Sequence, residues 1–100
     1  MLDVKDILSG DYVGKKVTVC GWVRNHRKQK EFGFIDFSDG TSFKHLQVVY
    51  TNKITDFDSI VKFHNGASVK VVGDFIKSEG SGQDYELKAK SIELLGDCSE

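Results

Sequence analysis

Aromatic, amide and basic side chains in the first half of the sequence have the chemistry needed to hold a single-stranded nucleic acid. A ring can stack on an unstacked base, an amide can donate to and accept from a base edge, and cations can neutralise phosphates. Phe34 supplies a ring and Gln47 an amide. A strip over 15–30 holds basic residues and no acidic residue; the basic ones are Lys15, Lys16, Arg24, Arg27, Lys28 and Lys30. This combination predicts a partner that offers a few phosphates in a defined place.

Each of these features also has a purely structural explanation. The net charge is −1, and a lysine-rich edge is often only a solvated surface that opposes aggregation. Phe34 could be a half-covered ring packed on a long loop, since single exposed apolar residues are common. On the residues alone, both interpretations of Phe34 stay open.

Other kinds of chemistry find little support in the sequence. The three histidines fall one per predicted element without cysteine partners, so we expect no metal site. Gly80-Ser81-Gly82 lacks the Lys-Ser/Thr that follows a phosphate-binding loop, and a flexible hairpin explains it better. Asp36 and Asp39 bracket a turn, where acids usually accept hydrogen bonds from turn amides. No nucleophile signature is present, so we expect no catalytic residue.

Length and composition place the chain among ordinary globular proteins. One hundred residues, 39% of them apolar, predict a single domain over 1–100. No apolar run approaches the ~20 residues of a membrane helix. The first ten residues do not resemble a signal peptide, and Cys20 and Cys98 belong to no paired motif. We therefore expect two free thiols, a cytoplasmic location and no membrane partner.

The hydrophobic pattern predicts five strands and two helices. Alternating apolar residues predict strands over 17–24, 32–37, 46–51, 69–76 and 85–94. Helical spacing predicts a helix over 54–64, with Thr55 and Asp58 as a capping box. A short helix over Val4–Ser9 is predicted before the first strand, with Asp3 as N-cap and Gly10 as stop.

This order predicts an all-β fold with one internal helix, the five-stranded OB-type Greek-key barrel of order β-β-β-α-β-β. Gly21 and Gly73 lie inside two strands that must bend sharply, and Gly21 suggests a bulge or a tight bend. An SH3-like barrel is the rival fold, and it lacks a helix between its third and fourth strands.

Strand alternation predicts which residues face outward. If Ile35 and Phe37 point into the barrel, then Phe34 points out. Inward Leu46 and Val48 likewise put Gln47 outside, so Phe34 and Gln47 share the outer face of neighbouring strands; the other residues predicted outside are Phe32, Asp36 and Val49.

The orientation of Arg27 stays open. Strict alternation from Val23 puts Arg27 inside, and a bulge at Gly21 or a strand end near Asn25 reverses that prediction.

Five segments form a specific combined pattern that covers nearly the whole chain: 17–27, 32–41, 46–49, 66–73 and 80–89. Together they resemble the N-terminal domain of the class II aspartyl-, asparaginyl- and lysyl-tRNA synthetases. The compact hairpin Gly80-Ser81-Gly82-Gln83 and the turn Asp39-Gly40-Thr41 look most like a bacterial-type asparaginyl enzyme.

The resemblance implies an anticodon-binding domain whose partner is tRNA. By motif position, Phe34 stacks on the middle anticodon uridine, Gln47 hydrogen-bonds the edge of that base, and Arg27 assists. Arg24 and Lys28 join them as further anticodon-binding residues.

The family also implies a homodimeric ligase that uses ATP and Mg²⁺, with a catalytic domain after Glu100. We therefore expect these 100 residues alone to be monomeric, to need no cofactor and to catalyse nothing. An aspartyl or lysyl synthetase, or a free-standing OB protein that binds single strands, is the alternative. A small protein-interaction module that docks a partner on Phe34 is a third possibility.

Overall fold

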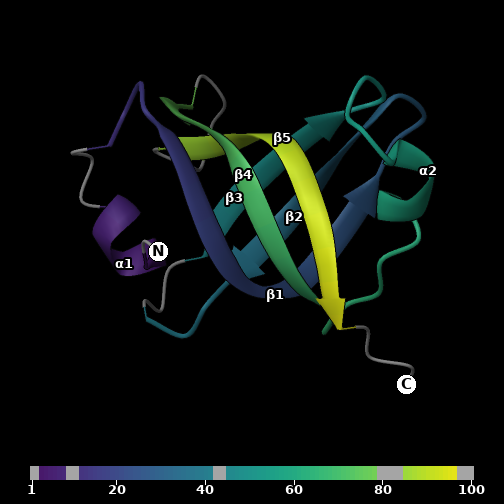
Figure 1. Ribbon diagram of the computed structural model, residues 1–100, viewed down its shortest axis with the longest axis horizontal. Coiled ribbons are helices and arrows are strands. Elements are labelled where there is room, and N and C mark those ends of the chain that lie inside the picture. Colours follow the sequence, from purple (N-terminus) through teal and green to yellow (C-terminus); the bar gives the residue numbers. More distant parts are fainter. Residues whose placement is uncertain (1–2, 9–11, 42–44, 79–84, 97–100) are drawn as a thin grey trace.

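In the part of the chain that the structure describes, the alternating apolar residues form five strands, and two short helices pack beside them (Figure 1). The computed structural model describes residues 3–8, 12–41, 45–78 and 85–96. The predicted stop at Gly10, the predicted hairpin at 79–83 and Cys98 lie outside these residues. In chain order the elements are α1 (Val4–Ile7), β1 (Lys16–Lys28), β2 (Phe32–Ser38), β3 (Leu46–Thr51), α2 (Phe57–Ile60), β4 (Ser68–Lys77) and β5 (Tyr85–Gly96).

The strands close into a barrel in the order β1-β2-β3-β5-β4, with β4 pairing back to β1. Strands β3 and β5 are parallel, and the other neighbours are antiparallel. Strand β1 serves two partners, because its first half pairs with β4 and its second half with β2. With a helix between β3 and β4, this is the OB-type barrel predicted from the sequence.

Strand β1 bends where it passes from one partner strand to the other. Trp22 is in register both with Ser68 of β4 and with Ser38 of β2. At the preceding residue, Gly21, a Cβ would overlap the carbonyl oxygen of Ser38 and lie 2.8 Å from the Phe37 ring. The close approach of two backbones therefore requires glycine. Of the two predictions for Gly21, the tight bend is confirmed.

The two helices lie at opposite sides of the barrel in Figure 1. Val4 and Ile7 of α1 and Ile60 of α2 are fully buried. They pack with the inward side chains of the strands, which include Val17, Val19, Val23, Ile35, Phe37, Leu46, Val48, Tyr50, Val69, Val71, Phe75, Leu87 and Ile92. Because the interior is filled in this way, functional side chains have to lie on the outer face of the sheet.

The N-terminus of α1 is capped by a residue distant in sequence. The prediction of Asp3 as the N-cap residue is confirmed, although its side chain makes no capping hydrogen bond. Val4 N–H instead donates to Asp39 Oδ2 at 2.9 Å, and Lys5 N–H donates to Thr41 Oγ1 at 3.1 Å. Burial alone would raise the pKa of Asp39, but hydrogen bonds from Thr41 and Val4 together outweigh it and lower that pKa. The turn after β2 thus ties α1 to the barrel.

Helix α2 is a single turn, much shorter than the helix predicted over 54–64. Its N-cap is Asp56, whose φ of 64° lies in the left-handed region. A residue in the left-handed region cannot belong to the right-handed helix that follows it, so the helix begins at Phe57 and not at the predicted position 54. The predicted capping box of Thr55 and Asp58 is therefore wrong. The apolar spacing correctly indicated Ile60 as a core residue.

Candidate nucleic-acid interface

The outer face of β2 and β3 carries the aromatic and amide side chains singled out in the sequence. Phe34 lies opposite Val49 and Asp36 opposite Gln47, and all four side chains are partly exposed. The alternation between the two faces is confirmed, since the inward residues are all buried; these are Ile35, Phe37, Leu46, Val48 and Tyr50.

A β-bulge at Arg24 decides which residues of β1 join this face. The register with β2 shifts between Val23 and Asn25, which leaves Arg24 as the extra residue. A bulge moves the alternation by one residue, so Arg27 becomes an exposed residue of the outer face. Strict alternation, which put Arg27 inside, is wrong. The bulge that reverses it lies three residues after Gly21.

Arg27 lies over the ring of Phe34. The two residues are in register across β1 and β2, and the guanidinium carbon is 5.6 Å from the ring centroid. This distance falls within the ~6 Å range of cation–π contacts. Phe32 meets the same ring edge to face, with centroids 5.4 Å apart and the rings at 90°. Phe34 is thus held by two neighbours while its ring stays partly open to solvent.

A hollow of about 270 Å³ opens beside this ring. It is smaller than the ~300–1,000 Å³ typical of sites for whole small molecules, which suits one base better than a larger ligand. Its walls come from Asn25, Arg27, Phe34, Ile35, Asp36 and Gln47. Sequence reasoning did not assign Asn25 or Asp36 to the site. Residues two apart on a strand share a face, so the position of Arg27 predicts Asn25 on the outer face and that of Phe34 predicts Asp36 there.

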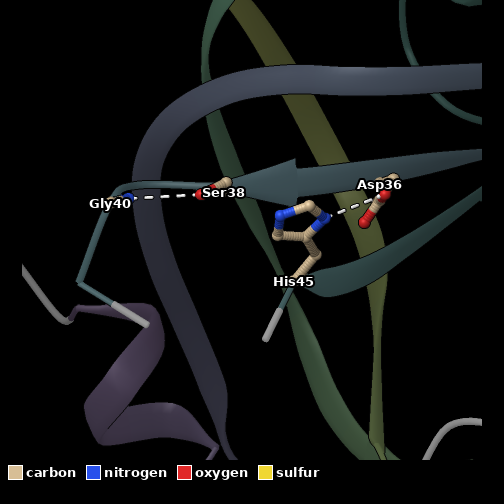
Figure 2. A network of polar contacts seen from close by, with 4 residues as sticks. All are labelled: Asp36, Ser38, Gly40 and His45. Atoms are coloured by element: carbon tan, nitrogen blue, oxygen red, sulfur yellow. Dashed lines mark hydrogen bonds and ion pairs between the residues drawn. The ribbon is translucent and has the colours of Figure 1, made fainter. Parts of the chain in front are cut away.

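The carboxylate of Asp36 is oriented by His45 (Figure 2), whose Nδ1 lies 3.0 Å from Asp36 Oδ2. Both side chains are partly exposed, so this contact contributes little to stability and mainly fixes the carboxylate at the wall of the hollow. Figure 2 also shows Gly40 N–H donating to Ser38 Oγ at 3.2 Å. The prediction that the turn acids accept turn amides is confirmed for Asp39, which accepts from the backbone N–H of Thr41 at 3.0 Å, and for Asp36 it stays a prediction.

The inward neighbour of Arg27 is His26, which anchors β1 beyond the bulge. Its Nδ1 lies 3.0 Å from the carbonyl oxygen of Phe63, and its Nε2 lies 2.7 Å from the Tyr50 hydroxyl. Because a carbonyl only accepts, Nδ1 carries the proton in the neutral ring and Tyr50 donates to Nε2. Burial lowers the pKa of His26 in spite of the bond to Phe63, and burial raises the pKa of Tyr50 to about 12. With His26 fixed inward, its neighbour Arg27 stays on the outer face.

The other basic residues are spread along β1. Arg24 is exposed at the bulge, and Lys28 is exposed opposite Gly33; neither lines the hollow. Lys16 lies in the other half of β1, where its register partner in the neighbouring strand β4 is Asp74. The basic residues over 15–30 are continuous in sequence, but only those in the C-terminal part of this segment lie near the hollow.

The structure also bears on other kinds of site. Within residues 3–8, 12–41, 45–78 and 85–96, no three His, Cys, Asp or Glu side chains are placed to hold a metal ion. In the same part of the chain, no helix has both the length and the apolarity needed to cross a membrane. Cys20 is a free thiol, as predicted.

Comparisons with known proteins agree with the fold. The asparagine–tRNA ligase of Acholeplasma laidlawii is 44% identical over 90 residues, which cover 89% of this chain and 19% of that protein. The corresponding ligase of Microcystis aeruginosa is 41% identical over 96 residues, covering 95% and 21%. The solved structure of asparaginyl-tRNA synthetase from Pyrococcus horikoshii, complexed with asparaginyl-adenylate, superposes with a TM-score of 0.78 at 26% identity. It covers 90% of this chain and 21% of that one.

The resemblance to asparaginyl enzymes is therefore confirmed, and the chain spans about a fifth of the length of the curated relatives it matches. The family model described as the OB-fold nucleic acid binding domain matches residues 17–95, which include all five strands apart from the first residue of β1 and the last of β5. The barrel order and the matched residues lead to one conclusion: this chain belongs to the family of OB-fold nucleic acid binding domains.

Proposed function

We propose that this domain recognises a tRNA anticodon by holding its unstacked middle base, a uridine, in the hollow beside Phe34. One observation carries the proposal: Arg27, Phe34 and Gln47, from three different strands, meet around a single hollow. Stacking on an exposed aromatic ring contributes ~1–3 kcal/mol per base. RNA is recognised in this way where its bases are splayed out of a helix, as in loops.

The polar residues of the hollow supply the choice of base. The amide of Gln47 offers both a donor and an acceptor, which a uracil edge can use. Arg27 presents a planar cation that can stack on the base or bind a phosphate. Arg24 and Lys28, exposed on the same half of β1, are placed to neutralise neighbouring phosphates.

The names of the relatives support a place for this domain within an asparagine–tRNA ligase. Because the chain spans about a fifth of those proteins, ligase activity, ATP and Mg²⁺ use, homodimerisation and a cytoplasmic location are proposed for the longer protein only. In this proposal residues 1–100 form one anticodon-binding domain, monomeric when isolated, that binds tRNA and catalyses nothing.

The test is a titration of the domain with anticodon stem-loop RNAs that carry either U or C at the middle position. We expect tighter binding of the U form. Gln47→Ala should reduce that preference by about 2- to 12-fold, the equivalent of one net hydrogen bond of ~0.5–1.5 kcal/mol. Gln29→Ala is the matched control, because this exposed glutamine lies outside the hollow.

Two results would overturn the proposal. One is equal affinity of the unmodified domain for the U and C stem-loops. The other is equally tight binding of an unstructured oligonucleotide, which would instead indicate a single-strand-binding protein without choice of sequence.

A further inference from the structure

The side chain of Phe32 is partly exposed to solvent on the same face as Phe34. It is 40% exposed, although burying a phenylalanine is favourable. The other large apolar side chains exposed in the described part of the chain, Val13, Leu94 and Leu95, are all aliphatic. Phe32 and Phe34 are two residues apart on β2, so both point outward. The edge-to-face contact between the two rings makes one aromatic surface of them.

A second hollow, of about 380 Å³, lies along Phe32. Val49, which forms part of its wall, is the register partner of Phe34. The first hollow includes the next row of this face, Asp36 and Gln47. The two hollows therefore lie on either side of the row that Phe34 and Val49 form. The second hollow is lined by Glu31, Phe32, Val49, Thr51, Asn52 and Lys53.

The backbone that carries Phe32 is fixed by hydrogen bonds on both sides. Gln29 N–H donates to the carbonyl oxygen of Phe32 at 2.8 Å, and Asn52 N–H donates to that of Glu31 at 2.7 Å. The exposed ring is thus presented by a hydrogen-bonded strand end, as a stacking surface requires, because a preorganised group loses little freedom on binding.

The charges around Phe32 suit a nucleic acid. Lys53 forms part of the wall of the second hollow, where Glu31 is the acidic residue. Lys28 and Lys30, both exposed, lie at the end of β1 and in the loop that leads to Phe32. Three cations thus lie near the route of the phosphates that would join a base on Phe34 to a base on Phe32.

We infer that Phe32 is a second stacking position, which holds the unstacked base next to the one on Phe34. The domain then binds two neighbouring bases of one RNA strand on a pair of rings. This inference rests on the proposed function, because it takes the surface of Phe34 as the first base site.

The experiment titrates the domain and four variants, Phe32→Ala, Phe32→Trp, Phe34→Ala and the control Leu95→Ala, with stem-loop RNAs. The RNAs carry a middle uridine and are either intact or lack the base immediately 5′ or 3′ of it. We expect Phe32→Ala to weaken binding of the intact loop by about fivefold or more, the lower limit for one stacked base. The effect should vanish with the RNA that lacks the base held on Phe32. Phe32→Trp should retain full affinity, and Leu95→Ala, an exposed apolar control, should change nothing.

The outcomes separate this inference from the proposed function. If Phe34→Ala weakens binding and Phe32→Ala does not, the second position is refuted and the anticodon site stands. If Phe32→Ala weakens all three RNAs equally, Phe32 only positions Phe34 and the inference is refuted. If the unmodified domain does not bind the intact loop, both the proposed function and the inference fall.

Discussion

Truncation of Phe34 to alanine should separate a binding role from a structural one. Its ring is held by an edge contact from Phe32, worth ~0.5–1.5 kcal/mol, and by the Arg27 guanidinium, worth ~0.5–1 kcal/mol. Loss of both contacts gives a stability cost of ~1–2.5 kcal/mol, below the ~3–5 kcal/mol of a fully buried phenylalanine. The loss of stacking should weaken RNA binding by ~1–3 kcal/mol, or about 5- to 150-fold.

The assay pairs a thermal melt with the stem-loop titration. For a domain of this size, ~1 kcal/mol shifts Tm by ~4–8 °C, so a loss of ~1–2.5 kcal/mol should lower the Tm of Phe34→Ala by ~4–20 °C and leave the variant folded. Phe37→Ala is the matched comparison, because the same residue type on the same strand points into the core and is 0% exposed. It should lower Tm far more.

The reasoning about Phe34 fails on either of two results. A fall in Tm as large as that of Phe37→Ala would show that Phe34 is a core residue. Unchanged RNA affinity of a folded Phe34→Ala protein would show that bases do not stack on it.

Two further predictions concern the support behind the hollow. Because burial puts the pKa of His26 below the unfolded value near 6.5, the unfolded chain binds the proton more readily. The stability this residue contributes should be present above about pH 6.5 and be lost as the pH falls through its lower folded pKa. Urea midpoints followed over that range should show this decline in the unmodified domain and a smaller one in His26→Gln; parallel curves would contradict the assignment. Gly33→Ala should destabilise by ~1–3 kcal/mol, because a Cβ would overlap the hydroxyl end of the Tyr50 ring. Gly96→Ala, with no atom within 4 Å of its Cβ, is the control, and equal urea midpoints for the two variants would refute the argument.

The strands and their two faces could be predicted because one physical rule governs them. A half-buried strand must alternate, so the buried Ile35 and Val48 were enough to place Phe34 and Gln47 outside. The order of elements then selected the barrel, since few all-β folds place a helix between the third and fourth strands.

The features that could not be predicted from the sequence depend on contacts between segments that are distant along the chain. The bulge at Arg24 has no local signature, because any polar residue can be the extra one in a strand. Its position follows from the register that β2 imposes on the second half of β1. In the same way, Asp39 caps α1 only because the fold brings the turn after β2 to the first helix.

The double pairing of β1 has a consequence for how the chain folds. The first half of β1 pairs with β4, which is far along the chain, as the register partners Lys16 and Asp74 show. Strand β3 likewise pairs with β5, which is synthesised after it. Such long-range pairings make folding slow, because a long loop must close before each one forms. During synthesis, β1 to β3 would leave the ribosome first as an open meander with an unpaired edge on β3. Only when β5 inserts between β3 and β4 is that edge covered, so the strand of the barrel that is synthesised last also protects it from edge-to-edge aggregation.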